Sequence, residues 1–220
     1  AASFSHSNEE ASAGYYSVRL DNNIRVELTT STRAGFHRYT FPSEDCFITI
    51  DLHHRDFLKQ GAIEVINDRR LAIQRISQAW AREQHCYAQL EFSEPIAETT
   101  YNEDKTKLIL RFRSESKTLL IKAGLSFTGT EGAFKNLTDE IPHWSFDQTR
   151  DEAREVWNQA LSRIEVREEN EEKLRTFYTA LYHVMIHPNV AMDVDGTYRG
   201  MDNELHRAEG FTYYTVFSLW

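Results

Sequence analysis

The spacing of apolar residues changes near residue 147, and this change constrains the fold more than any other feature of the sequence. Ahead of it, Ile24, Val26 and Leu28 alternate with polar residues, which is the period of a half-buried β-strand. Beyond it, across residues 147–166, apolar residues recur at helical spacing, as on one face of an amphipathic helix. The sequence therefore predicts a β-rich region followed by a helical one.

Short apolar runs separated by turn-forming residues fill the first part of the chain. Strands are predicted at residues 14–20, 24–29, 36–41, 46–52, 62–66, 71–76, 85–92, 107–112 and 118–123. The breaks between them carry residues that favour turns, among them Pro42, Gly61 and Pro95. Because no helical pattern lies between the strands, we predict an antiparallel β-sandwich or barrel of at least about eight strands rather than a parallel sheet.

Two helices are predicted after the change in period. The first spans residues 147–166 with Asp147 as its N-cap, and the second spans residues 171–186 between Asn170 as N-cap and Pro188. The charged stretch between them is typical of a solvated link. We accordingly divide the chain into a β-sandwich domain at 1–146, a linker helix at 147–169, and the start of a second domain at 170–220.

Composition excludes several classes of function. The 220 residues include 25 basic and 34 acidic side chains, a net charge of −9, which argues against a nucleic-acid partner. No apolar run reaches the roughly 18 residues of a membrane span. Cys46 and Cys86 both lie in strand-like runs, so two buried thiols are favoured, and a disulfide between them stays open as the alternative.

Short motifs add little chemistry. The acidic loop at residues 193–202 fails the EF-hand pattern, because Tyr198 stands where the loop requires glycine. The chain has no nucleotide-binding glycine motif and no nucleophile elbow. Asn136 begins a glycosylation acceptor triplet, which chance also produces often. His37 and Arg38 are expected to point to opposite faces of one strand.

Longer blocks carry a stronger signal. The segments FSHSNEEASAGYYSVRL, IRVELTTSTRAGFHRYTFP, LSFTGTEGAFKNLTDEIPHWSFDQTRDEAREVWNQAL, FYTALYHVMIHPNV, DVDGTYRGMD and YYTVFSLW follow one another along nearly the whole chain. Taken together and in this order, they resemble glycoside hydrolase family 92. The family's chain starts earlier and continues much further than the sequence printed here.

The resemblance implies the front of a calcium-dependent, inverting exo-α-mannosidase, with α-1,2 as the commonest linkage. It implies an N-terminal β-sandwich followed by the first helices of an (α/α)6 barrel, which is the catalytic domain begun at 170–220. The catalytic acid, the catalytic base and the calcium ligands are expected beyond Trp220, so this chain alone is predicted to be inactive and to bind no calcium. Arg199, Asp202 and Trp220 are expected near the sugar, and a mannose-containing glycan is the expected partner.

Two other readings remain open: a carbohydrate-binding module without catalysis, and a purely structural sandwich. The family resemblance favours a compartment outside the cytoplasm of a bacterium, whereas the residues themselves leave the compartment undetermined. The helix at 171–186 carries a broad apolar stripe that includes Leu174, Phe177 and Leu181. We expect this stripe to pack against the sandwich, to self-associate with a second copy, or to be poorly ordered.

Overall fold

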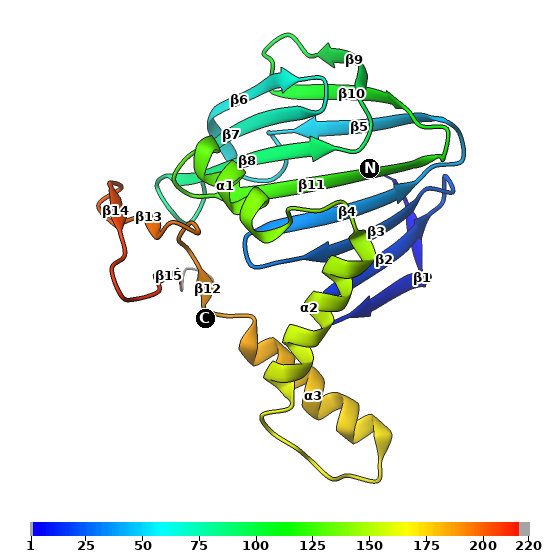
Figure 1. The fold of residues 1–220 in the computed structure, drawn as a ribbon, viewed down its shortest axis with the longest axis vertical. Coiled ribbons are helices and arrows are strands. Elements are labelled where there is room, and N and C mark those ends of the chain that lie inside the picture. The colour runs from blue at the N-terminus through cyan, green and yellow to red at the C-terminus, as the bar shows by residue number, and fades with distance from the viewer. Residues whose placement is uncertain (1, 216–220) are drawn as a thin grey trace.

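A computed structural model describes residues 2–215, and its first part is built almost entirely of antiparallel strands (Figure 1). Eleven strands precede residue 147: β1 (Phe4–Ser12), β2 (Tyr15–Leu20), β3 (Arg25–Thr30), β4 (Ala34–Thr40), β5 (Asp45–Asp51), β6 (Phe57–Asn67), β7 (Arg70–Gln78), β8 (Gln84–Phe92), β9 (Ile96–Tyr101), β10 (Lys107–Arg113) and β11 (Thr118–Ser126). The predicted strands are therefore confirmed. The sequence reading missed β1, which is polar and exposed, and β9, where only the two ends are partly buried.

The strands form two sheets. The larger sheet has the order β1-β2-β3-β4-β11-β8-β7-β6, and the smaller one has the order β5-β10-β9. Their facing sides enclose the main apolar core, which includes Phe92, Leu110, Phe112 and Ile121. Strand β10 of the small sheet shows the physical basis of the alternating pattern. Every second residue of β10 is buried against the core, and the residues between are exposed. The predicted antiparallel sandwich is confirmed.

Three helices follow the sandwich strands: α1 (Thr130–Glu140), α2 (Phe146–Leu161) and α3 (Glu171–Met185). The sequence reading missed α1 altogether. It also misplaced α2, which is capped by the Ser145 side chain instead of Asp147 and ends at Leu161 rather than at residue 166. The prediction for α3 is confirmed, since Asn170 accepts hydrogen bonds from the backbone N–H groups of Glu172 and Lys173.

Helix α1 lies on the outer face of the large sheet and makes a third layer there (Figure 1). A second apolar cluster joins Phe36 of β4 to Leu137 and Ile141, at the end of α1, and to Phe146 of α2. The helix comes very close to β11 at Gly124, where an added Cβ atom would lie 2.1 Å from the carbonyl oxygen of Ala133. The absence of a side chain at this position therefore sets the distance between helix and sheet.

Both cysteines are free thiols, Cys46 buried in the core and Cys86 partly buried on β8, so the disulfide alternative is wrong. Burial raises the pKa of Cys46 to about 11, and it also raises the pKa of Cys86. Neither thiol therefore has the low pKa that marks a reactive cysteine.

An ion-pair network ties α2 to the large sheet. The Arg38 guanidinium donates two hydrogen bonds of 2.8 Å to the Glu27 carboxylate and reaches Asp147, in the first turn of α2, at 3.2 Å. The same guanidinium lies over the ring of Phe146. As predicted, His37, the preceding residue of the strand, points to the opposite face; there it contacts the Tyr39 hydroxyl. The paired Arg38 lowers the pKa of Glu27 below its usual range.

Helix α3 packs against α2, where the rings of Trp157 and Tyr182 lie 4.6 Å apart between centroids. No residue of α3 is fully buried, although Leu174, Phe177 and Leu181 are half-buried. The stripe is therefore partly covered by α2, which was not among the expected partners. Whether a second copy covers it stays a prediction.

Gly124→Ala is expected to destabilise the fold strongly, because the new methyl group must displace the backbone of α1. Overpacking of this kind costs about 1–3 kcal/mol or more. Denaturant unfolding followed by circular dichroism measures the change. Gly129→Ala is the matched control, since nothing lies within 4 Å of an added Cβ atom there. Equal stabilities of the two variants would contradict the close approach of α1.

Glu27→Gln is expected to lower stability at neutral pH by about 1.5–3 kcal/mol, because a buried, charge-assisted pair with Arg38 is lost. The pKa of Glu27 is lowered on folding, so its contribution is present above the unfolded value of about 4.3 and is lost as pH falls through the lower folded value. The difference in unfolding free energy between wild type and variant should therefore shrink in acid. A constant difference across the pH range would argue against the pair.

Candidate functional site

The loop after α3 docks against the junction of β11 and α1. It contains a hairpin of β13 (Thr197–Arg199) and β14 (Leu205–Arg207), flanked by the short pair β12 (Asn189–Val190) and β15 (Tyr214–Thr215). Figure 1 shows this hairpin beside α1, on the side of the molecule away from β1. The hairpin carries two of the predicted sugar-binding residues, Arg199 and Asp202, with Asp202 in its turn.

Asp193 anchors the loop from inside. Its carboxylate is only 3% exposed and accepts hydrogen bonds from Ser126 at 2.9 Å, from Thr128, and from the Asn136 amide at 2.8 Å. Asp193 is the first acidic residue of the loop that fails the EF-hand pattern. Because the fold uses its oxygens to bind protein donors, they are occupied by the scaffold.

Asn136 completes this anchor from α1. Its amide nitrogen donates to the Leu125 carbonyl of β11 at 2.7 Å as well as to Asp193, and its amide oxygen accepts from the Val194 N–H at 2.8 Å. One fully buried side chain thus joins a strand, a helix and the loop. The same residue heads the glycosylation acceptor triplet, and its burial leaves no room for a glycan in the folded chain. No local sequence signal could have identified this role, because all three partners are distant in the chain or belong to the backbone.

Arg199 holds the hairpin against the sandwich. Its guanidinium donates to the carbonyl oxygens of Phe127 at 3.0 Å, Thr128 at 3.3 Å and Asn203 at 2.7 Å. Arginine supplies five donors, so this side chain keeps donor capacity for a ligand. All the contacts of its guanidinium described above are with backbone carbonyl oxygens of the protein. Its proposed contact with sugar stays a prediction.

Asp202 lies at the exposed turn of the hairpin. Its carboxylate contacts His206 Nε2 at 2.8 Å and accepts the Glu204 N–H at 3.0 Å. These contacts, the backbone one first, lower the pKa of Asp202. The neighbouring Asn203 donates to Glu83, in the loop before β8, at 3.0 Å. Asp202 is therefore an ionised acceptor that faces solvent, and its contact with sugar also stays a prediction. Trp220, the third predicted residue, lies outside the described residues.

Aromatic rings line the hairpin on one side. Tyr198 stacks on Tyr213 with centroids 4.0 Å apart and planes 19° apart, and it also contacts His206 and Phe211. Stacking between the hairpin and the segment that follows it fixes the position of both. This aromatic cluster was not predicted from the sequence, since its members are separated by irregular spacing.

Calcium does not fit the described residues. Across residues 2–215 no group of three or more His, Cys, Asp or Glu side chains is arranged to hold a metal ion. Calcium requires six or more oxygen ligands, and the acidic residues of the loop are already paired: Asp193 with Asn136, and Asp195 with Lys135 at 3.3 Å.

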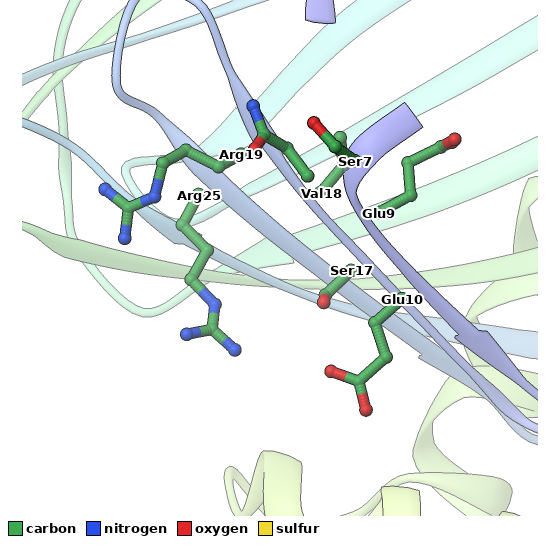
Figure 2. A pocket seen from close by; sticks show the side chains of 8 residues that line it. Ser7, Glu9, Glu10, Ser17, Val18, Arg19 and Arg25 are labelled. Atoms are coloured by element: carbon green, nitrogen blue, oxygen red, sulfur yellow. The ribbon is translucent and has the colours of Figure 1, made fainter. Parts of the chain in front are cut away.

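A surface depression lies at the opposite end of the large sheet. It forms where β1 leaves the register of β2 between Phe4 and Glu9, and Figure 2 shows Arg19 and Arg25 on one side of it with Glu9 and Glu10 on the other. Glu9 is already bonded to Tyr16 at 2.6 Å, and Arg25 contacts Glu27 at 3.4 Å. The depression is open and mixed in charge, so its geometry selects no class of ligand.

Two sequence profiles of one family together match the whole chain. The N-terminal domain of glycosyl hydrolase family 92 matches residues 1–133, and the catalytic domain of the same family matches residues 132–220. The chain belongs to glycosyl hydrolase family 92. The two matches meet at the start of α1. The predicted boundary between residues 146 and 147 stays a prediction.

Solved structures of family 92 resemble the fold closely. An α-mannosidase from Bacteroides thetaiotaomicron superposes with a TM-score of 0.87 at 28% identity, over 100% of this chain and 33% of that one. An inverting mannosidase from the same species gives a TM-score of 0.84 at 26% identity, over 97% of this chain and 31% of that one. This family 92 chain therefore corresponds to about a third of each enzyme.

A curated relative is named an uncharacterized secreted glycosidase, from Arthroderma benhamiae. It is 24% identical over 219 residues, which cover 81% of this chain and 28% of that protein. In residues 2–215 no helix is long and apolar enough to cross a membrane. The curated relative and the two solved relatives all have names that describe glycosidases.

Asn136→Asp is expected to destabilise the chain and release the 193–207 loop. The substitution keeps the shape of the side chain but places a carboxylate against the Asp193 carboxylate and the Leu125 carbonyl. An uncompensated buried charge costs about 3–5 kcal/mol. Unfolding experiments and hydrogen exchange of the loop amides test this. Asn158→Asp on the exposed face of α2 is the matched control, and a loss of similar size there would contradict the anchor.

Proposed function

We propose that the protein containing this chain is an exo-acting α-mannosidase that removes terminal mannose from glycans. The observation that carries the proposal is the match of both family 92 domains in sequence order over residues 1–220. The solved relatives named as α-mannosidases support the substrate class, and one of them was solved in complex with mannoimidazole. Inversion at the anomeric carbon is supported by the relative named an inverting mannosidase.

The chain's own part is to build the framework on which the rest of the enzyme forms its site. An inverting glycosidase needs a general acid and a general base about 6.5–9.5 Å apart. Of the described carboxylates nearest the proposed sugar site, Asp193 is buried and bonded to Asn136, whereas Asp202 contacts His206 and still faces solvent. We infer that the catalytic pair, and the calcium ligands, come from residues beyond this chain, and that Arg199, Asp202 and Trp220 contribute to sugar binding.

The preferred linkage is proposed to be α-1,2, and the compartment is proposed to lie outside the cytoplasm. The compartment is supported by the curated relative, which is named a secreted glycosidase. The linkage rests on the family resemblance alone. Assays with α-1,2-, α-1,3- and α-1,6-linked mannobiose distinguish the linkages directly.

The full-length protein should release β-mannose from an α-mannoside, because an inverting mechanism reverses the anomeric configuration. Proton NMR of the first product identifies the anomer before it mutarotates, and a chelator should abolish release. The 220-residue chain is the matched control and should show no turnover, since general acid and base catalysis each contribute about 10²–10⁴-fold. Release of α-mannose would contradict inversion. Turnover by the short chain would contradict the placement of the carboxylates, and binding of mannosides by a full-length protein without turnover would favour a carbohydrate-binding module.

A further inference from the structure

A row of charged residues crosses the face of the large sheet that α1 covers. Arg70 of β7 pairs in register with Glu91 of β8, and Glu91 pairs with Lys122 of β11, so all three side chains leave the same face of the sheet. A second surface depression, separate from the one beside β1, lies at one end of this row. Asn67 stands opposite Arg70 there, at the β6–β7 turn, and Trp144 of the α1–α2 connection also lines it. The residues that line it are Asn67, Arg69, Arg70, Glu91, Phe92 and Trp144.

The acidic member of the row is neutralised within the protein. The Glu91 carboxylate contacts Lys122 Nζ at 3.0 Å. Lys122 is almost fully buried, donates to the Ile141 carbonyl at 3.2 Å, and lies 4.4 Å from the centre of the Trp144 ring. Three contacts therefore commit the Lys122 ammonium to the scaffold. The positive charges left at the depression are those of Arg69 and Arg70.

Arg70 is held in place by an aromatic ring rather than by a described hydrogen bond. The guanidinium group lies over the Phe134 ring of α1, 4.3 Å from its centre, and its Nε is buried without an acceptor among the described residues. Glu91, its cross-strand neighbour, forms no ion pair with it in the described part of the chain because that carboxylate turns to Lys122. A buried charged donor without an acceptor is costly, so this guanidinium favours an external acceptor.

Arg69 adds a second guanidinium at the rim. It is exposed at the β6–β7 turn, where the Asn67 side chain accepts its backbone N–H at 2.9 Å and one of its own nitrogens donates to the Ser93 carbonyl. These contacts orient the side chain and leave donors on the other nitrogens. Two arginines that line one depression, beside a carboxylate already paired with Lys122, have the chemistry that binds oxyanions.

We propose that this depression, between the β6–β7 turn and the α1–α2 connection, is a binding site for an oxyanion group, either a phosphate or sulfate group or a carboxylate. Arg70 and Arg69 donate to the anion, and the partly exposed Trp144 ring forms the adjacent wall. The site does not depend on the proposed mannosidase function. An oxyanion here belongs to a charged sugar or another acidic ligand, and neutral mannose is not expected to occupy it.

Isothermal titration calorimetry of the full-length protein tests the site, with inorganic phosphate, sulfate, acetate and mannose as separate probes at constant ionic strength. The wild-type protein should bind at least one oxyanion, and mannose should not displace that anion. Arg70→Gln and Arg69→Gln should each weaken binding by about tenfold or more, the scale of one lost charge-assisted hydrogen bond. A preference among the three anions identifies the source of the group.

Arg113→Gln is the matched control, because it removes one exposed positive charge from the small sheet. It should leave binding unchanged. Circular dichroism establishes that each variant is folded, and Arg69 at the exposed turn provides a variant outside the core if Arg70→Gln unfolds. The proposal is overturned if wild type binds no oxyanion, if Arg113→Gln weakens binding as much as the two pocket variants, or if mannose displaces the anion.

Discussion

The amide of Asn136 is the interaction on which the arrangement of the second half of this chain depends. It is fully buried, and its hydrogen bonds join α1 to two other parts of the fold: one goes to the last strand of the sandwich, and two go to Asp193 and to the Val194 N–H in the loop that follows α3. A buried amide left unsatisfied costs as much as several ordinary contacts provide. The loop therefore has one position in which every buried group is paired, and the hairpin with Arg199 and Asp202 is fixed by it.

Close packing beneath that amide makes the arrangement possible. Gly124 lets the backbone of α1 approach β11, and Gly132 leaves room for the Asp193 carboxylate, which an added Cβ atom would meet at 2.2 Å. Two glycines thus decide where a helix and a loop can lie. The need for every buried polar group to be hydrogen-bonded then selects one arrangement among those that the packing allows. The same logic applies at α2, where Arg38 and Glu27 join the helix to the large sheet.

The sandwich and the helical segment differ in how fully their apolar residues are buried. The core between the two sheets contains fully buried aromatic and aliphatic side chains, whereas no residue of α3 is fully buried. The chain spans about a third of the solved family 92 enzymes that it resembles. The apolar stripe of α3 is only half-covered within the described residues, and the proposed activity belongs to the whole protein.

The sequence by itself determined the antiparallel sandwich, the two later helices and the family, because these depend on periodicity and on long blocks of residues. The alternation in β10 and the cap at Asn170 are local features that a sequence states directly. Only the tertiary structure revealed α1, whose buried face combines Ala133 and Leu137 with the polar Asn136 and so gave no clear apolar stripe. It alone placed Asp193 inside the protein and left Arg70 Nε without an acceptor within residues 2–215, since both outcomes depend on parts of the chain that are distant in sequence.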